Sequence, residues 1–150
     1  IALMRMEALE VAAKLDLVFI APDEVCLELE AGAAAGHPPV RPPWLAVQSL
    51  TSALPVMVTS VLDAGEAAVI QLALDEGIGR VCIDELKGRR MALAVGLKVT
   101  GTLGLLGKAK REGLISDVRP FLSRALQAGI HYHPELVRRF LNAIDDDPEP

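Results

Sequence analysis

The chain has 150 residues, which is the length of one domain that buries about 70% of the surface its unfolded form exposes. Apolar residues make up 51% of it and aromatic residues only 3%, a composition typical of a parallel sheet buried on both faces. The net charge of −5 argues against a broad surface that coats nucleic acid. No apolar run reaches the roughly 20 residues that span a bilayer, so a cytoplasmic protein with reduced thiols is predicted.

The first elements follow from local composition. Residues 2–14 are rich in Ala, Leu, Met and Glu and predict one helix, and the short apolar run at 17–20 predicts a buried strand. A helix from residue 22 to about residue 30 is expected next. Pro suits its first turn, Asp23 complements the positive end of its dipole, and Gly32 can end it.

The middle of the chain gives weaker signals. Residues 33–43 are rich in Gly and Pro and predict a loop. Residues 44–50 alternate in polarity and predict a strand. Residues 51–62 are ambiguous, although the run at 56–58 favours a strand with Pro55 at its edge.

The second half predicts helices and strands in regular alternation. Helices are expected at residues 64–76, 85–95, 103–112, 117–128 and 134–143, and strands at 80–83 and 97–100. Such alternation indicates an α/β fold, a three-layer α/β/α arrangement around a central, mostly parallel sheet. Residues 1–144 are expected to form this domain, and the acidic tail at 145–150 is expected to be disordered.

Two carboxylates mark the predicted carboxyl end of the sheet. Glu66 lies at the start of a helix, and Asp84 follows a strand directly. In an open α/β sheet both positions face the crevice where ligands bind, and a pair of carboxylates there suits a cation such as Mg²⁺. Asp63 and Glu66 also fit a capping box, and Asp84 also suits an N-cap, so both interpretations stay open.

Glu28 lies among three glutamates of one predicted helix, a pattern that by itself favours a residue facing water. The turn from Thr100 to Gly104 closes a strand and opens a helix, which suits either a bound phosphate or a simple helix cap. Lys87, Arg89 and Arg90 share a helical turn after Asp84. A basic rim of this kind suits a polyanionic substrate, although charged helix faces are usually just solvated.

The order of these motifs resembles the PIN-domain superfamily, and specifically a prokaryotic branch of predicted nucleic-acid-binding PIN proteins, over essentially all of residues 1–144. The likeness rests on Ile20-Ala21-Pro22, Glu24-Val25, Glu28-Leu29, Leu62-Asp63-Ala64-Gly65-Glu66-Ala67, Ile83-Asp84, Arg89-Arg90, Ala92, Val99-Thr100-Gly101-Thr102-Leu103-Gly104 and Ala109-Lys110-Arg111-Glu112-Gly113-Leu114-Ile115. The resemblance implies a ribonuclease that depends on Mg²⁺ or Mn²⁺, with an antitoxin protein as its partner.

The resemblance also implies roles for single residues. Glu28, Glu66 and Asp84 would be the acids that bind metal and catalyse hydrolysis of an RNA phosphodiester. The candidates for RNA contact are Lys87, Arg89, Arg90, Thr100 and Thr102. The family's first strand carries a further Asp, and this sequence begins at the helix that follows that strand, so the strand is expected before Ile1. The resemblance also implies a homodimer.

Two other functions stay open from the residues alone. The first is a catalytically inactive PIN-like module that binds RNA or a protein. The second is an unrelated phosphate-handling α/β protein that uses the turn beginning at Thr100.

Overall fold

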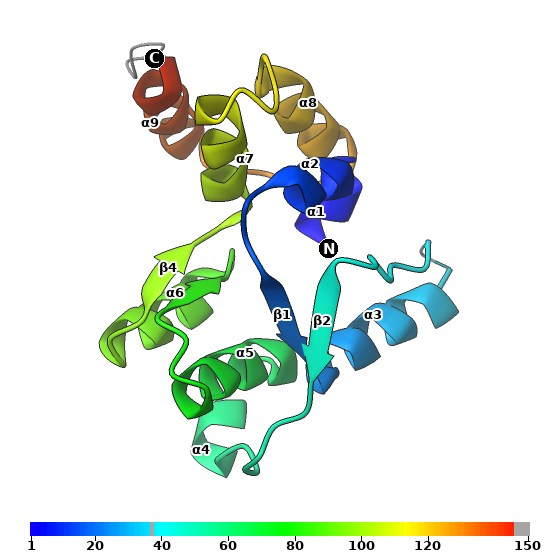
Figure 1. Cartoon of the computed structure of the whole chain (residues 1–150), viewed down its shortest axis with the longest axis vertical. Helices are drawn as coiled ribbons and strands as arrows, with labels where there is room; N and C mark the ends of the chain where they lie inside the picture. Colours follow the sequence, from blue (N-terminus) through cyan, green and yellow to red (C-terminus); the bar gives the residue numbers. More distant parts are fainter. Residues whose placement is uncertain (37, 146–150) are drawn as a thin grey trace. The chain divides into compact units, whose positions relative to one another are not determined.

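The computed structural model describes residues 1–36 and 38–145, which form two compact units along the chain (Figure 1). The helical unit combines residues 1–16 with the segment from residue 102 onward, and the strand unit comprises residues 17–101. Helices and short parallel strands make the chain a mixed α/β protein, as the sequence predicts.

The strand unit contains two ladders of parallel strands. β1 (Phe19–Pro22) pairs with β2 (Leu45–Gln48), and β3 (Arg80–Cys82) pairs with β4 (Lys98–Thr100). In both ladders the first residue of one strand lies opposite the first residue of the other. Parallel pairing is thus confirmed, and within the described part of the chain the strands pair two by two rather than in one continuous ladder.

Helix α5 is the central element of the strand unit. The described helices of this unit are α3 (Asp23–Ala34), α4 (Val56–Thr59), α5 (Ala64–Asp75) and α6 (Leu86–Ala94). Helix α5 packs against β1 and β3, and it also contacts α3 and α6. Six of its residues are buried, and a helix that is apolar on nearly all sides belongs in a core. One element therefore touches both ladders.

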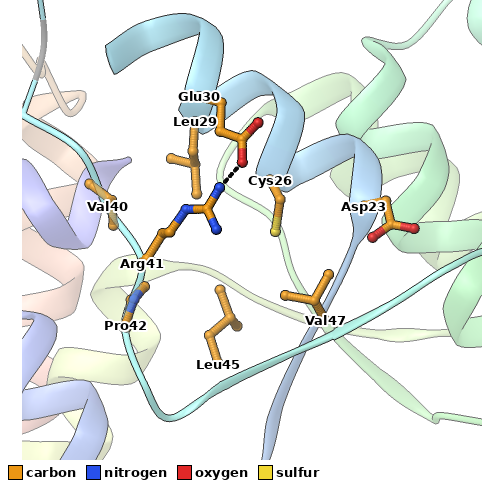
Figure 2. A pocket seen from close by; sticks show the side chains of 9 residues that line it. All are labelled: Asp23, Cys26, Leu29, Glu30, Val40, Arg41, Pro42, Leu45 and Val47. Carbon is orange, nitrogen blue, oxygen red and sulfur yellow. Dashed lines mark hydrogen bonds and ion pairs between the residues drawn. The ribbon is translucent and has the colours of Figure 1, made fainter. Parts of the chain in front are cut away.

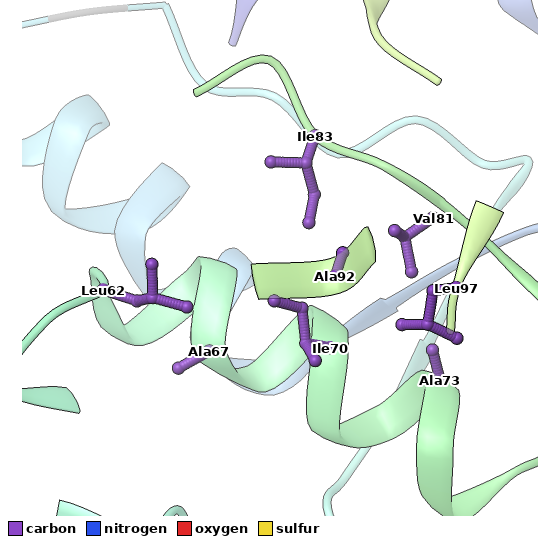
Figure 3. Close-up of a cluster of buried hydrophobic side chains, with 8 residues drawn as sticks. All are labelled: Leu62, Ala67, Ile70, Ala73, Val81, Ile83, Ala92 and Leu97. Carbon is purple, nitrogen blue, oxygen red and sulfur yellow. The ribbon is translucent and has the colours of Figure 1, made fainter. Parts of the chain in front are cut away.

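A hydrophobic cluster joins α5 to β3 and α6 (Figure 3). Its buried members are Leu62, Ala67, Ile70, Ala73, Val81, Ile83, Ala92 and Leu97. Burying one Val or Ile side chain of this kind contributes about 1.5–3 kcal/mol to folding. Ile83 is buried in this cluster and Asp84 is the next residue, so the core fixes the backbone position of Asp84.

The helical unit is built from the two ends of the described chain. Its helices are α1 (Ala2–Arg5), α2 (Leu9–Lys14), α7 (Thr102–Arg111), α8 (Arg119–Gln127) and α9 (Pro134–Asp145). Their shared core includes Met6, Leu106 and Val118, each at most 1% exposed. The helices predicted for residues 103–112, 117–128 and 134–143 are all present, with ends shifted by up to two residues.

The single helix predicted for residues 2–14 is wrong, because α1 and α2 are separate. Glu7 between them has a φ of 55°, a left-handed conformation that interrupts a helix. The residues on either side of it, Met6 and Ala8, are both completely buried. Tertiary packing of these two side chains therefore outweighs the helix propensity of the segment.

Two further predictions in the first half need correction. Helix α3 runs past Gly32 and ends at Ala34, where Gly36 with a φ of 96° supplies the left-handed stop. The run at 56–58 forms the one-turn helix α4 and not a strand. Its N-cap is Pro55, whose carbonyl accepts hydrogen bonds from the amides of Val58 and Thr59. The strand predicted at 17–20 lies two residues later, as β1.

No helix in the described ranges has both the length and the apolar character needed to cross a bilayer. Of the acidic tail predicted at 145–150, Asp145 is the last residue of α9 and accepts a hydrogen bond from Arg119. The remaining five tail residues lie outside the described part of the chain.

Candidate active site

Glu28 joins α3 to the beginning of α5. One of its carboxylate oxygens, Oε1, accepts a hydrogen bond of 2.9 Å from the backbone amide of Gly65. That amide belongs to the first turn of α5, where the helix itself offers no acceptor. The α5 N-cap residue, Asp63, makes no side-chain cap bond, so Glu28 supplies the acceptor from 37 residues away. Glu28 is an exposed residue, as its helix pattern favours, and its carboxylate also contacts the start of α5.

Glu66 does not form the capping box that its spacing also allowed. The absence of a side-chain cap bond at Asp63 removes one half of that motif, and Glu66 Oε1 is buried without a hydrogen-bond partner. The same oxygen would lie 2.6 Å from a Cβ placed on Gly88 of α6. The carboxylate thus rests against the neighbouring helix instead of bonding to the start of its own.

The surroundings of Glu66 raise the pKa of its carboxyl above the ordinary value of 4.5. Loss of hydration is the largest cause, followed by the negative charges of Glu85, Asp63 and Glu28, and Lys87 acts in the opposite direction. Several carboxylates therefore place a negative potential on one partly buried oxygen pair. A bound cation would relieve this repulsion.

Asp84 lies between β3 and the start of α6, directly before the N-cap residue of that helix. The N-cap of α6 is Glu85, which makes no side-chain cap bond, so Asp84 is not the helix cap that its position suggested. A Cβ placed on Gly101 would lie 2.7 Å from Asp84 Oδ1 and 3.0 Å from Arg89 Nη1. The carboxylate and the guanidinium therefore meet at the glycine that follows β4.

Each of the three predicted acids rests on a glycine. Glu28 lies over Gly65, Glu66 lies over Gly88, and Asp84 lies over Gly101, with carboxylate oxygens 2.6–2.8 Å from the position of an added Cβ. Real Cβ contacts are essentially never this short, so any other residue would push the carboxylate away. The sequence pattern missed these glycines as site residues. Gly65 and Gly88 lie inside helices, where glycine costs about 1 kcal/mol and so draws attention, whereas Gly101 lies between β4 and α7 and carries no such signal.

The three acids do not gather into one metal-binding group. In the described ranges, no three His, Cys, Asp or Glu side chains come together to hold a metal ion. The convergence of Glu28, Glu66 and Asp84 on one cation, which the sequence predicts, is therefore absent from this arrangement. The Gly65 amide engages Glu28, and Asp84 lies beside the Arg89 guanidinium, so the acids are divided between two neighbourhoods.

The five predicted RNA-contacting residues differ in their surroundings. Lys87 and Arg90 are exposed on α6. Arg89 is partly buried and donates from Nη1 to the backbone carbonyls of Ile83 and Thr100, at 2.8 and 3.1 Å. Thr102, in the first turn of α7, is only 3% exposed.

The turn after Thr100 is poorly suited to a phosphate. The space over Gly101 contains the Asp84 carboxylate, whose charge would repel a second anion. This disfavours the interpretation of the chain as a phosphate-handling protein that uses the turn.

A cavity of about 370 Å³ lies elsewhere in the strand unit, between α3 and β2 (Figure 2). Its lining is mostly apolar, and the ion pair between Arg41 and Glu30 lies along one side (Figure 2). None of the predicted acids or RNA-contacting residues lines it. The candidate active site is therefore separate from this cavity.

Comparison with known proteins identifies the family. A protein-family model described as a PIN domain matches residues 1–146, which is nearly the whole chain and includes both compact units. No curated protein and no solved structure matches the chain. The match covers all three acids and the three glycines beneath them. The chain belongs to the PIN-domain family.

Proposed function

We propose that this protein is a metal-dependent ribonuclease of the toxin type, which hydrolyses RNA phosphodiesters at a divalent cation bound by carboxylates. PIN domains are generally nucleases and typically use divalent metal ions. The observation that carries the proposal is Glu66. Its buried Oε1 has no hydrogen-bond partner, and neighbouring carboxylates raise the pKa of its carboxyl. A hard cation would satisfy both the unpaired oxygen and the repulsion.

The donor set fits such a cation in chemistry, since carboxylate oxygens are the ligands that Mg²⁺ and Mn²⁺ prefer. Glu66 and Glu28 would hold the ion, and Asp84 is the third acid of the proposed set, lying in the separate neighbourhood beside Arg89. When bound, the cation would activate a water molecule and stabilise the leaving oxygen. The exposed Lys87 and Arg90 on α6 would contact the RNA phosphates and orient the strand.

We expect RNA cleavage by the intact protein, including any residues that precede Ile1, to need Mg²⁺ or Mn²⁺ and to stop with a chelator. Asp84→Asn keeps the side-chain size and loses the charge, so kcat should fall by at least about hundredfold while the melting temperature is unchanged. Cleavage of single-stranded RNA under single-turnover conditions measures this.

The matched control is Asp75→Asn at the far end of α5, where the carboxylate accepts only hydrogen bonds from exposed side chains. Its activity should equal that of the unmodified protein. Full cleavage by Asp84→Asn would refute the assignment.

A second candidate is a PIN-like module that binds RNA or a protein partner, such as an antitoxin, without cleaving it. The observation in its favour is that the three acids form no metal-binding group within the described chain. Tight RNA binding by the intact protein, with no cleavage at any concentration of Mg²⁺ or Mn²⁺, would select this function over the first.

A further inference from the structure

Arg89 joins the ends of two strands. Its Nη1 donates to the Ile83 carbonyl, just after β3, and to the Thr100 carbonyl, at the end of β4. The Thr100 carbonyl also accepts the backbone amide of Ile83 at 3.0 Å, the last bond between these two segments. One guanidinium nitrogen therefore bonds to both segments at the end of the β3–β4 ladder, directly before Asp84 and Gly101.

The same nitrogen lies beside Asp84. Arg89 Nη1 and Asp84 Oδ1 approach the same point over Gly101, at 3.0 and 2.7 Å from a Cβ placed there. A positive and a negative charge thus act together at this strand end.

We propose that Arg89 is a positioning residue, which clamps the ends of β3 and β4 and thereby fixes the Asp84 carboxylate against Gly101, and that it is not a contact for RNA phosphate. Hydrogen bonds from a charged donor to buried carbonyls are stronger than those between neutral groups, so this clamp is stiff. Arg90, the next residue, is exposed on the same helix and carries the same charge, which makes it the natural comparison.

The clamp is tested without any activity by hydrogen exchange of the Ile83 amide in the full chain. Arg89→Gln removes the second donor to the Thr100 carbonyl, so this amide should exchange about tenfold to hundredfold faster. Arg89→Lys, which retains a charged donor, should restore part of the protection. Arg90→Gln should leave exchange at Ile83 unchanged. Equal exchange in Arg89→Gln and Arg90→Gln would overturn the clamp.

The effect on catalysis rests on the proposed function and is read from kinetics. Arg89→Gln should lower kcat by about tenfold or more and leave KM within about twofold, whereas Arg90→Gln should raise KM and weaken its salt dependence. Added to Asp84→Asn, the Arg89 change should have no further effect, because both act through one carboxylate. A raised KM with an unchanged kcat in Arg89→Gln would show a phosphate contact and refute positioning.

Failure of the two ideas can be told apart. If the unmodified intact protein cleaves no RNA, the ribonuclease proposal fails, and exchange at Ile83 still decides whether Arg89 clamps the strand ends. If the protein cleaves RNA but Arg89→Gln leaves hydrogen exchange of the Ile83 amide unchanged, the clamp is refuted and the ribonuclease proposal still holds.

Discussion

The three acids differ in position and in surroundings, since Glu66 lies in the first turn of α5, Asp84 lies between β3 and α6, and Glu28 lies in the middle of α3. Glu28 accepts a backbone amide, Asp84 lies beside a guanidinium, and Glu66 has a buried oxygen with no partner. Only the last arrangement is unfavourable for a charged group in a folded protein. Glu66 is therefore the residue at which stability and function are expected to conflict.

This conflict makes a prediction about pH. Because the pKa of Glu66 is raised on folding, the destabilisation caused by ionising this carboxyl is absent below the ordinary value of 4.5. It grows as the pH rises from that value to the folded-state pKa and is complete above it. In the presence of a chelator, Glu66→Gln should therefore raise the melting temperature at pH 7.5 and leave it unchanged at about pH 4.

Thermal unfolding followed by circular dichroism measures the difference. The control Glu30→Gln, an exposed residue paired with Arg41, should show no such pH-dependent gain. An equal gain from Glu66→Gln at both pH values would mean that packing, and not charge, is responsible.

At the scale of elements, the hydrogen bond from the Gly65 amide to Glu28 ties α3 to α5, the helix that touches both ladders. Glu28→Ala removes the acceptor from the first turn of α5 and should lower the free energy of unfolding by about 1 kcal/mol. Urea denaturation measures this change. Glu30→Ala, on the same helix, should change it by less than about 0.5 kcal/mol. Equal stability of the two variants would contradict a cap formed across 37 residues.

The elements of the second half could be predicted from sequence because their apolar spacing is regular and because a glycine with positive φ follows each of the helices α5, α6, α7 and α8. In the first half of the chain, the sequence predictions are wrong where tertiary packing determines the backbone conformation. Met6 and Ala8 are both buried on either side of Glu7 with its positive φ, and the run Val56-Met57-Val58 forms a helix after Pro55. Neither outcome follows from local propensity, since each depends on neighbours that the segment does not contain.

The candidate site shows the same division. Strand and helix order predicts where Glu66 and Asp84 lie, whereas Glu28 is proposed only from the family resemblance, and the role of all three as metal ligands stays a prediction. The glycines were missed as site residues because their role is to leave room for the carboxylates of Glu28, Glu66 and Asp84, and only the structure shows these contacts. Arg89 resembles its exposed neighbours in sequence, and only the hydrogen bonds to Ile83 and Thr100 set it apart.

At the scale of the whole molecule, several large apolar side chains remain uncovered in the strand unit. Val18 is 86% exposed, and the consecutive Val56 and Met57 of α4 are 82% and 84% exposed. Exposed apolar side chains of this kind mark surfaces that a partner covers. We predict a homodimer, so sedimentation at micromolar concentration should give twice the chain mass of 16.0 kDa.

A double variant tests whether α4 forms the dimer contact. If it does, replacing Val56 and Met57 by serine should shift the sedimentation mass toward that of one chain. A single chain mass for the unmodified protein at micromolar concentration would contradict the prediction.

The glycines beneath the acids offer a way to separate binding from chemistry. A single added methyl at Gly101 would collide with Asp84 Oδ1 and displace it, yet it would alter no charge, leaving the net charge at −5. Substitution of an acid by its amide, in contrast, always changes the electrostatic field that attracts a polyanion. Under the proposed ribonuclease function, Gly101→Ala would therefore bind RNA with unaltered long-range attraction and leave it uncut, so that the bound sequence could be recovered and read.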